Sequence, residues 1–373
     1  MDDITRTPHY RDLLGAIPAE NYVGEDVLAM EIERIFKPSW LCVGALADLA
    51  NHQDFVTARV GPHSIVVQNF KGELKAFRNV CSHRFSRLQT EPCGNRRLQC
   101  PYHGWLYDAA GVPIGIPQND SAFGLSEAEK ATLSLQAYDL ALAGHFVFVR
   151  MAGDGPDLRD YLGEVYDFLV HVSQICPQRV EEARVDLACN WKLAVENGVE
   201  AYHHALVHPE TFTHVLQQDI VMNAYGPHCT HEGDLTEKSR HWWSVVADKA
   251  RLKPSALYRD YISFLIFPNI VTTFTYGALF TFQVIVPTSA VTTHIAASAW
   301  LAEGGGAALR PVIASLNGFA EKVRAEDRAI CAIAQQGVAE RGLGRAAVLG
   351  EVDNRVRHFQ NAYARRLGEV RHA

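Results

Sequence analysis

The segment from residue 81 to residue 105 contains two cysteines and two histidines at short spacing. Cys81 and His83 are separated by one residue and, sixteen residues further on, Cys100 and His103 are separated by two. Thiolates and imidazoles are the protein ligands of zinc ions and of some iron–sulfur clusters. One cysteine and one histidine on each of two loops therefore indicate a metal-binding site.

The alternation of the two ligand types distinguishes between these metals. In a Rieske [2Fe–2S] centre, two cysteines hold one iron and two histidines hold the other, so that each loop can supply one ligand to each iron. A zinc ion could use the same four donors, although zinc motifs more often keep like ligands together. The spacing favours a Rieske cluster held by Cys81, His83, Cys100 and His103, with zinc as the alternative.

A second set of potential ligands lies between residues 190 and 210. Two imidazoles and one carboxylate on one face of an Fe(II) ion leave positions open for O₂. On a continuous helix His204 and His208 share a face, whereas His203 and His208 lie roughly 140° apart. Pro209 disfavours helical geometry at His208, which weakens that objection. Spacing alone leaves both pairs open.

The carboxylate ligand has to come from another part of the chain. Residues 319–337 have the pattern of an amphipathic helix, and its predicted apolar stripe consists of Phe319, Val323, Ile330 and Ala334. Asp327 falls within this stripe. A carboxylate without a partner on an apolar face is costly, so we expect a metal, an arginine or a backbone donor beside it. Glu326 as the ligand, or Asp327 in a buried ion pair, are the alternatives.

Length and composition limit the class of protein. The 373 residues are enough for two domains, and the 35 basic and 42 acidic residues leave a formal charge of −7, which opposes non-specific nucleic-acid binding. No apolar run approaches the length of a membrane span, and the first residues are not typical of a signal peptide. The eight scattered cysteines indicate a reducing compartment rather than disulfides, so a cytoplasmic location is expected.

The elements that position these residues follow from hydrophobic periodicity. We expect a helix at 24–36, β-hairpins between 40 and 150, a helix at 158–172 and a strand at 180–188. A helix at about 190–207, strands between 261 and 301, and helices at 309–339 and 351–367 complete the chain. The pattern predicts an α+β protein with three parts: an N-terminal helical segment 1–37, a β-domain 38–152, and a domain 153–373 with an antiparallel sheet and long helices.

Several motifs resemble those of a known family. "CSHR" and "CPYHGWLYD" are similar to the two cluster-binding loops of Rieske non-haem iron oxygenases. "NWKLAVENGVEAYHHALVHPE" is similar to their catalytic motif N-W-K…E-N-x-x-[D/E]-x-Y-H-x-x-x-x-H. The chain is identified on these motifs as the terminal oxygenase, or alpha subunit, of the aromatic-ring-hydroxylating dioxygenase family. Phe85 departs from the pattern, because family members usually have glycine there.

The resemblance implies a fold and a set of site residues. It implies an all-β Rieske [2Fe–2S] domain, an N-terminal helix packed on the catalytic part, and a helix-grip catalytic domain. His203, His208 and Asp327 would hold a mononuclear Fe(II), and a glutamine several residues later corresponds to Gln335 or Gln336. Glu200 would connect the iron-bound histidine to a Rieske histidine of a neighbouring subunit in a homotrimer.

The resemblance also implies partners and a reaction. Electrons from NAD(P)H would arrive through a separate flavin and iron–sulfur reductase, with or without a ferredoxin. The chain would hydroxylate or oxidatively dealkylate a small organic molecule with O₂. Glu200, where aspartate is commoner, resembles the branch that acts on quaternary ammonium compounds, and an aromatic substrate is the competing expectation. A Rieske electron carrier without oxygenase activity, or a zinc-stabilised binding module, would not need the second metal site.

Aromatic residues are frequent in the predicted strands of the second domain. They can line a substrate pocket or belong to the core of the domain, and the sequence does not distinguish these two roles. They are Phe264, Phe267, Phe274, Tyr276, Phe280 and Phe282.

Overall fold

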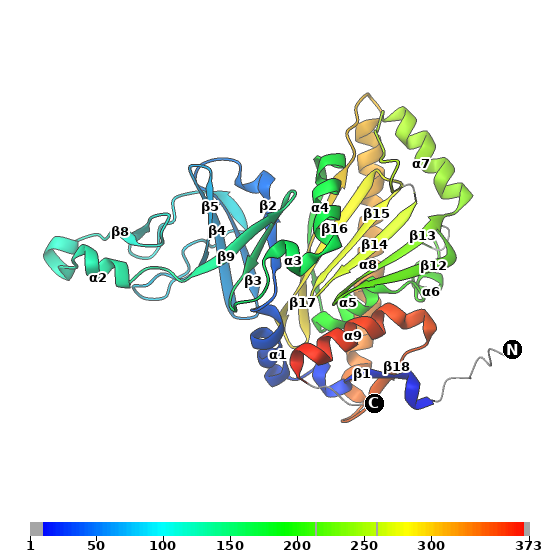
Figure 1. Cartoon of the computed structure of the whole chain (residues 1–373), viewed down its shortest axis with the longest axis horizontal. Helices are drawn as coiled ribbons and strands as arrows, with labels where there is room; N and C mark the ends of the chain where they lie inside the picture. Colours follow the sequence, from blue (N-terminus) through cyan, green and yellow to red (C-terminus); the bar gives the residue numbers. More distant parts are fainter. Residues whose placement is uncertain (1–9, 213–214, 259, 369–373) are drawn as a thin grey trace. The chain divides into compact units, whose positions relative to one another are not determined.

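The computed structural model describes residues 10–212, 215–258 and 260–368, without the side chains of 10, 11 and 217–220. Residues 1–9 of the expected N-terminal segment lie outside this set. The chain forms two compact units (Figure 1). One unit is Phe36–Val170, and the other combines the chain before and after it. No helix within the described ranges has both the length and the apolar character needed to cross a membrane.

The unit Phe36–Val170 is built on an antiparallel sheet with the order β2-β10-β9-β5-β4-β3-β6. Its strands are β2 (Leu41–Ala45), β3 (Asp54–Val60), β4 (His63–Phe70), β5 (Glu73–Arg78), β6 (Cys93–Asn95), β9 (Ala137–Ala143) and β10 (Phe146–Arg150). A separate small hairpin pairs β7 (Leu106–Tyr107) with β8 (Pro113–Gly115). The predicted strands between 54 and 78 are confirmed, and Gly61 and Gly72 turn between them with the positive φ that glycine tolerates.

The other unit contains a second antiparallel sheet with the order β11-β17-β16-β15-β14-β13-β12. Its strands are β11 (Gln178–Leu187), β12 (Leu216–Tyr225), β13 (His228–Leu235), β14 (Tyr261–Ile266), β15 (Ile270–Thr275), β16 (Leu279–Ser289) and β17 (Thr292–Leu301). A small sheet pairs β1 (Leu14–Pro18) with β18 (Ala346–Val348). The expected strands between 261 and 301 are present, whereas the β12–β13 hairpin was not predicted.

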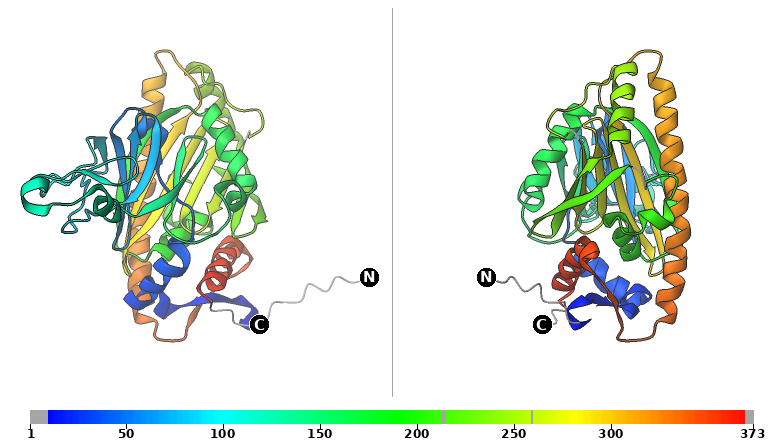
Figure 2. Two further views of the ribbon diagram at one scale, coloured as in Figure 1. Left: turned by 60° about the vertical axis from the view of Figure 1, so that its left-hand side comes forward. Right: turned by 90° about the vertical axis from the view of Figure 1, so that its right-hand side faces the viewer.

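Helices connect and cover these sheets. They are α1 (Glu25–Glu31), α2 (Glu127–Thr132), α3 (Leu158–Leu162), α4 (Glu164–Ile175), α5 (Trp191–Val199), α6 (His204–Val207), α7 (Glu237–Lys249), α8 (Leu309–Glu340) and α9 (Asn354–Leu367). The helix α8 runs alongside the second sheet (Figure 2) and packs against β11 and α5. A β-unit combined with a unit of one sheet and long helices confirms the predicted α+β class.

Two predicted helices differ in their boundaries from the observed ones. The expected helix 24–36 is α-helical only to Glu31, and residues 32–36 form a π turn. The expected helix 190–207 is interrupted, because Glu200 adopts an extended conformation (φ −115°, ψ 162°). Its carboxylate accepts hydrogen bonds from the backbone N–H groups of Tyr202 and His203, which start the next turn. Two short helices, α5 and α6, therefore replace one long helix.

The N-W-K residues connect α5 to α1 through a buried carboxylate. Asn190 caps α5 by accepting a hydrogen bond from the Lys192 backbone N–H. Trp191 Nε1 donates to Glu31 at 2.7 Å, and Lys192 Nζ pairs with the same fully buried carboxylate at 2.5 Å. The hydroxyl of Tyr363 on α9 donates to it as well. These bonds fix where α5 starts, and α5 leads directly to the histidines.

A second buried carboxylate, Glu196, predicts a pH dependence of stability. Burial raises its pKa to about 7 from an ordinary 4.5, despite hydrogen bonds from Tyr22 and Gln360. The folded state therefore holds a proton that the unfolded state loses above about pH 4.5. The associated stability is present below pH 4.5 and is lost as the pH rises through 7.

Replacing Glu196 with glutamine removes this ionisation and keeps the side-chain shape. We expect Glu196→Gln to increase the free energy of unfolding at pH 8 by on the order of 2–3 kcal/mol, and at pH 5 by much less. Thermal unfolding of both proteins at the two pH values measures the difference. An equal shift at both values would show that the substitution acts through packing instead.

Candidate metal centres

The two Cys–His pairs lie on neighbouring loops of the β-unit. Cys81 and His83 follow β5, and Cys100 and His103 precede β7. Each loop is closed by its own backbone, since Cys81 N–H donates to Ser86 O and Cys100 N–H donates to Trp105 O, both at 2.8 Å. Both cysteines belong to the buried core of this unit. The loops therefore hold all four side chains on a stable base.

The four side chains face one another. The two thiols are near enough that Cys100 contributes to raising the pKa of Cys81, although burial is the largest cause. The rings of His83 and His103 are 4.8 Å apart between centroids. Both Nδ1 atoms are buried and, within the described part of the chain, have no hydrogen-bond partner. A buried ring nitrogen without a partner is costly unless it binds a metal, so these donors fit a cluster with two cysteine and two histidine ligands.

Two aromatic side chains of the second loop support this centre, and of the two the sequence resemblance had included only Trp105. The Tyr107 hydroxyl lies 3.1 Å from Cys81 Sγ and accepts a hydrogen bond from Ser82 N–H at 3.0 Å. The Trp105 ring stacks on His83 at 4.9 Å with an interplanar angle of 4°. Both residues come shortly after His103 in the motif "CPYHGWLYD", and this motif is the sequence signal that could have identified Tyr107.

Phe85 occupies the turn of the first loop in an unusual conformation. Its φ is +61°, in the left-handed region where glycine is unstrained and other residues lose about 1 kcal/mol. Its side chain is 78% exposed. Glycine would adopt this conformation without strain, whereas Phe85 places an aromatic side chain on the surface of the first cluster loop.

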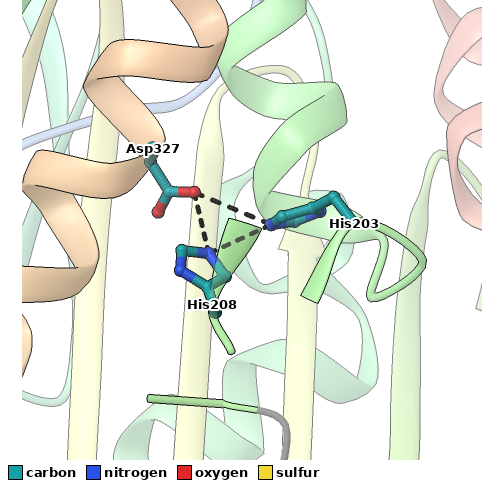
Figure 3. A group of neighbouring side chains, drawn as sticks. All are labelled: His203, His208 and Asp327. Atoms are coloured by element: carbon teal, nitrogen blue, oxygen red, sulfur yellow. Dashed lines mark hydrogen bonds and ion pairs between the residues drawn. The ribbon is translucent and has the colours of Figure 1, made fainter. Parts of the chain in front are cut away.

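The second centre is formed by His203, His208 and Asp327 (Figure 3). His203 lies just before α6, His208 just after it, and Asp327 on α8. The two Nε2 atoms are 3.2 Å apart, and Asp327 Oδ1 lies 3.1 Å from His208 Nε2 and 3.6 Å from His203 Nε2. Donors about 2.1 Å from one metal at about 90° lie roughly 3 Å from each other. The three atoms therefore fit one face of a single ion.

Each histidine of this group has a carboxylate behind it. Glu200 contacts His203 Nδ1, and Glu326 Oε2 lies 2.7 Å from His208 Nδ1. Because a carboxylate accepts the Nδ1 proton, each Nε2 lone pair is directed toward the centre of the group. Burial alone would lower the pKa of His203, but Asp327 and Glu200 outweigh it and raise the pKa to about 9. The site is thus polarised to hold positive charge.

The competing residues have other contacts. The His204 ring stacks on Phe212, with centroids 4.8 Å apart and an interplanar angle of 19°, and its nitrogens are not part of the converging group. Glu326 lies behind His208 and contacts its Nδ1, and it also accepts a hydrogen bond from the Thr211 hydroxyl at 3.0 Å. Asn197, which the sequence did not identify, donates to Asp327 at 2.9 Å and orients that carboxylate.

The packing face of α8 differs from the predicted stripe. Asp327 is partly buried as expected, and Phe319 is 39% exposed, but Ala334 is exposed, whereas Cys331 and Gln335 are buried. The stripe prediction was therefore wrong at Ala334, whereas Phe319, Val323 and Asp327 all line the same cavity. Gln335 accepts a hydrogen bond from Asn190 N–H and donates to Tyr22 O, and Gln336 is exposed.

A cavity of about 920 Å³ opens beside the three converging side chains. Its floor is one face of the sheet, with small and polar residues such as Ser263, Thr273 and Thr281. Aromatic residues at its wall come from outside the sheet, namely Phe212, Trp242, Trp243 and Phe319, and from the first residue of β14, Tyr261. A cavity of this size next to a metal group suits a small organic molecule.

The aromatic residues singled out in the strands do not line this cavity. Phe264, Phe274 and Phe280 alternate along their strands with the residues of the cavity floor, so they point to the opposite face of the sheet and are buried. The same applies to Phe282, and Phe267 is also buried away from the cavity. Tyr276 stacks on Trp243 at 5.9 Å. The five phenylalanines therefore belong to the core, whereas Tyr276 is half-buried and packs behind a residue of the cavity wall.

Comparison with known protein families assigns both units. Residues 39–138 match the model of the Rieske [2Fe–2S] domain. Residues 177–369, about half of the chain, match the model of the ring-hydroxylating alpha subunit, catalytic domain. The chain belongs to the ring-hydroxylating alpha-subunit family. The family predicted from the motifs is confirmed. The two domains of this alpha subunit are those that carry a Rieske cluster and a mononuclear iron.

Characterised relatives of this alpha subunit are mono- and dioxygenases, which are oxidoreductases. It is 31% identical over 206 residues to the glycine betaine monooxygenase oxygenase subunit of Chromohalobacter salexigens, an alignment covering 55% of this chain and 45% of that protein. It is 32% identical over 198 residues to the biphenyl 2,3-dioxygenase subunit alpha of Rhodococcus jostii, covering 51% and 42%. The aligned region thus spans less than half the length of these relatives.

Solved structures show the same fold for this alpha subunit over nearly its whole length. The quaternary ammonium Rieske monooxygenase CntA superposes with a TM-score of 0.76 at 22% identity, covering 94% of both chains. Naphthalene 1,2-dioxygenase from Rhodococcus sp. superposes with a TM-score of 0.74 at 20% identity, also covering 94% of both. The similarity therefore confirms a Rieske domain joined to a catalytic domain with one sheet and long helices.

Proposed function

We propose that this chain is the terminal oxygenase of a multicomponent Rieske non-haem iron oxygenase. Cys81, His83, Cys100 and His103 hold the [2Fe–2S] cluster, and His203, His208 and Asp327 hold a mononuclear Fe(II). The observation that carries the proposal is the convergence of Nε2, Nε2 and Oδ1 within 3.6 Å at the edge of a cavity. An electron carrier without oxygenase activity has no use for such a group, so this arrangement opposes that alternative.

The side chains around the group have distinct parts in this function. When bound, the mononuclear iron supplies O₂ activation beside the substrate. Asn197 holds Asp327 through its amide, while Glu200 and Glu326 fix the ring orientation and tautomer of His203 and His208. The cavity wall keeps the substrate next to the group and limits the entry of water. The residues therefore position the metal and the substrate rather than react themselves.

Electron supply in the proposal involves other proteins. NAD(P)H is oxidised by a separate flavin and iron–sulfur reductase, directly or through a ferredoxin, and the electrons enter at the cluster loops. Exposed aromatic residues beside the cluster, Phe85 and Tyr102, support a docking role for that surface. In the catalytic unit, Tyr202 and Leu206 are also largely exposed next to Glu200. These surfaces support a homotrimer in which Glu200 would bridge His203 to a cluster histidine of a neighbouring subunit, so that the electron would pass to the mononuclear site.

The proposed reaction is hydroxylation, dihydroxylation or oxidative dealkylation of a small organic molecule. The names of the relatives include both glycine betaine and biphenyl as substrates. The test is a single turnover. The protein is chemically reduced under anaerobic conditions and then mixed with O₂ and each of a panel of aromatic and trimethylammonium compounds. We expect the cluster absorbance to return to its oxidised form with formation of one oxygenated product. Oxidation without any product from the whole panel would favour a carrier.

Glu326 offers a test of the mononuclear site by itself. The variant Glu326→Gln keeps the size of the side chain but removes the carboxylate behind His208, so the imidazole becomes a weaker ligand. We expect the affinity for Fe(II) to fall on the order of 10- to 100-fold with an unchanged cluster spectrum. Titration of the iron-depleted mononuclear site with Fe(II) measures this, and an unchanged affinity would contradict the role given to Glu326.

A further inference from the structure

Arg355 is a buried arginine in the wall of the cavity that contains the proposed iron ligands. It lies in the first turn of α9 and is only 2% exposed. Burying a guanidinium is costly unless its charge is balanced and its N–H groups are hydrogen-bonded. The groups around Arg355 therefore indicate what it binds.

The hydrogen bonds of Arg355 leave most of its capacity unused. Nη1 and Nη2 both reach the same acceptor, Ser263 Oγ, at 3.3 Å, whereas a guanidinium carries five N–H donors. Its Nε is buried and has no hydrogen-bond partner within the described ranges. The Cys229 thiol lies beside the guanidinium and is only a weak acceptor. One long, shared hydroxyl contact does not satisfy this side chain.

Its positive charge is also not balanced within the described part of the chain, where no carboxylate forms an ion pair with it. Asp353, two residues earlier, directs its carboxylate to Gly350 N–H, and Glu196 is bonded to Tyr22 and Gln360. Another arginine of the same cavity, Arg324, pairs with Glu181 at 2.5 Å. Of these two arginines, Arg324 therefore has a carboxylate partner, whereas the guanidinium of Arg355 is available for an anionic ligand.

Neighbouring groups increase the need for an anion. The first turn of a helix has a positive electrostatic potential, so a cation there is unfavourable. Tyr261 and Ser263 face Arg355 as neutral groups, and burial together with Arg355 lowers the pKa of His231 to about 3. The imidazole of His231 is therefore neutral at physiological pH. This end of the cavity is positive without any compensating negative side chain among the described ones.

The cavity floor next to Arg355 continues as a row of polar side chains across adjacent strands. Ser263 pairs with His231 on one side and with Thr273 on the other, and Thr273 pairs with Thr281. The two threonine hydroxyls are 2.6 Å apart, and all these residues line the cavity. Hydroxyl groups in a row can donate to an anionic ligand, whereas a pocket for an unsubstituted hydrocarbon ring has no need of them.

We propose that Arg355 binds the carboxylate of an anionic or zwitterionic substrate, with the Ser263 hydroxyl as an additional donor. The guanidinium would donate two parallel hydrogen bonds to the carboxylate, which is the geometry that arginine favours. The carboxylate would anchor one end of the molecule, and the remainder would extend within the cavity toward His203, His208 and Asp327. That the bound molecule is a substrate rests on the proposed oxygenase function, whereas binding of its carboxylate to Arg355 does not.

Binding of matched ligands to the metal-loaded full chain tests this proposal. Benzoate is compared with benzyl alcohol, and glycine betaine with choline, so that each pair differs in its carboxylate. Affinities are measured by calorimetry for the wild type, for Arg355→Met and for Arg366→Met. Arg366 is an exposed residue of the same helix, which makes it a matched control. The two pairs also separate an aromatic acid from a betaine.

We expect at least one carboxylate to bind on the order of 10- to 100-fold more tightly than its counterpart. Arg355→Met should remove this difference, Arg366→Met should keep it, and Arg355→Lys should keep part of it because the charge remains. Carboxylates that bind no better than their counterparts to the wild type would overturn the proposal whether or not Arg355→Met folds. An unchanged affinity in a folded Arg355→Met variant would overturn it too.

The same ligands separate this proposal from the proposed function. Tight, Arg355-dependent carboxylate binding without oxygenation of any ligand would support the subsite and contradict the oxygenase. Oxygenation of the uncarboxylated compounds with equal affinity for both members of each pair would support the oxygenase and contradict the subsite.

Discussion

Replacing Asp327 with alanine is expected to remove the mononuclear iron and leave the [2Fe–2S] cluster in place. Asp327 Oδ1 is the one carboxylate oxygen in the converging group, and two imidazoles alone bind Fe(II) weakly. We expect iron to fall from about three to about two atoms per chain, and turnover to fall to background, with an unchanged visible spectrum. Iron analysis combined with absorbance spectroscopy measures both centres in one sample.

The control for Asp327→Ala is Glu321→Ala, an exposed acidic residue of the same helix. It should keep full iron content and full turnover. Loss of the cluster with retention of the other iron in Asp327→Ala would contradict the assignment of this helix. Retention of all iron would indicate that another carboxylate is the ligand, and Glu326 would be the first candidate because it already contacts His208.

Glu200→Gln is expected to separate electron transfer from iron binding. A glutamine can still accept the His203 Nδ1 proton, so the ring keeps its orientation. The affinity for Fe(II) should fall as it does for Glu326→Gln, and with Fe(II) supplied in excess both centres hold their iron. The substitution removes the negative charge behind His203, on which the proposed route from the neighbouring cluster depends. We expect turnover to fall on the order of 100-fold or more, since proton and charge positioning contribute 10²- to 10⁴-fold.

Two readouts give the Glu200 prediction a clear outcome. In a single turnover, the protein is reduced under anaerobic conditions and then mixed with substrate and O₂. The cluster of Glu200→Gln should remain reduced, while that of a Glu321→Gln control should be reoxidised. Loss of mononuclear iron instead would assign Glu200 to ring orientation alone. Full turnover would remove it from both roles.

The parts of the two centres differ in how far the sequence could predict them. The four cluster donors lie within 23 residues on two loops, so their spacing alone indicated how they meet. The choice between His203 and His204 required the break at Glu200, because the argument from helical periodicity assumes an unbroken helix. The resemblance to the family motif favoured His203 where geometry from sequence did not.

Contacts between distant segments could not be predicted from local patterns. Asn197 and Asp327 are 130 residues apart, and Tyr107 approaches Cys81 across 26 residues. The hairpin 216–235 was missed because its polar residues lack the regular alternation of a half-buried strand. Arg355 gave no signal, since a single arginine in a helix is usually on the surface.

The length of α8 has a consequence for how the catalytic centre tolerates change. One continuous helix carries Arg324, which pairs with Glu181, then Asp327, and then Gln335, which is bonded to Asn190. From the first to the last of these the helix advances about 16 Å. Deleting a single residue between Arg324 and Asp327 would turn the later positions by roughly 100° relative to the earlier ones. The three attachments would then face different directions, so insertions and deletions here should be far more damaging than substitutions.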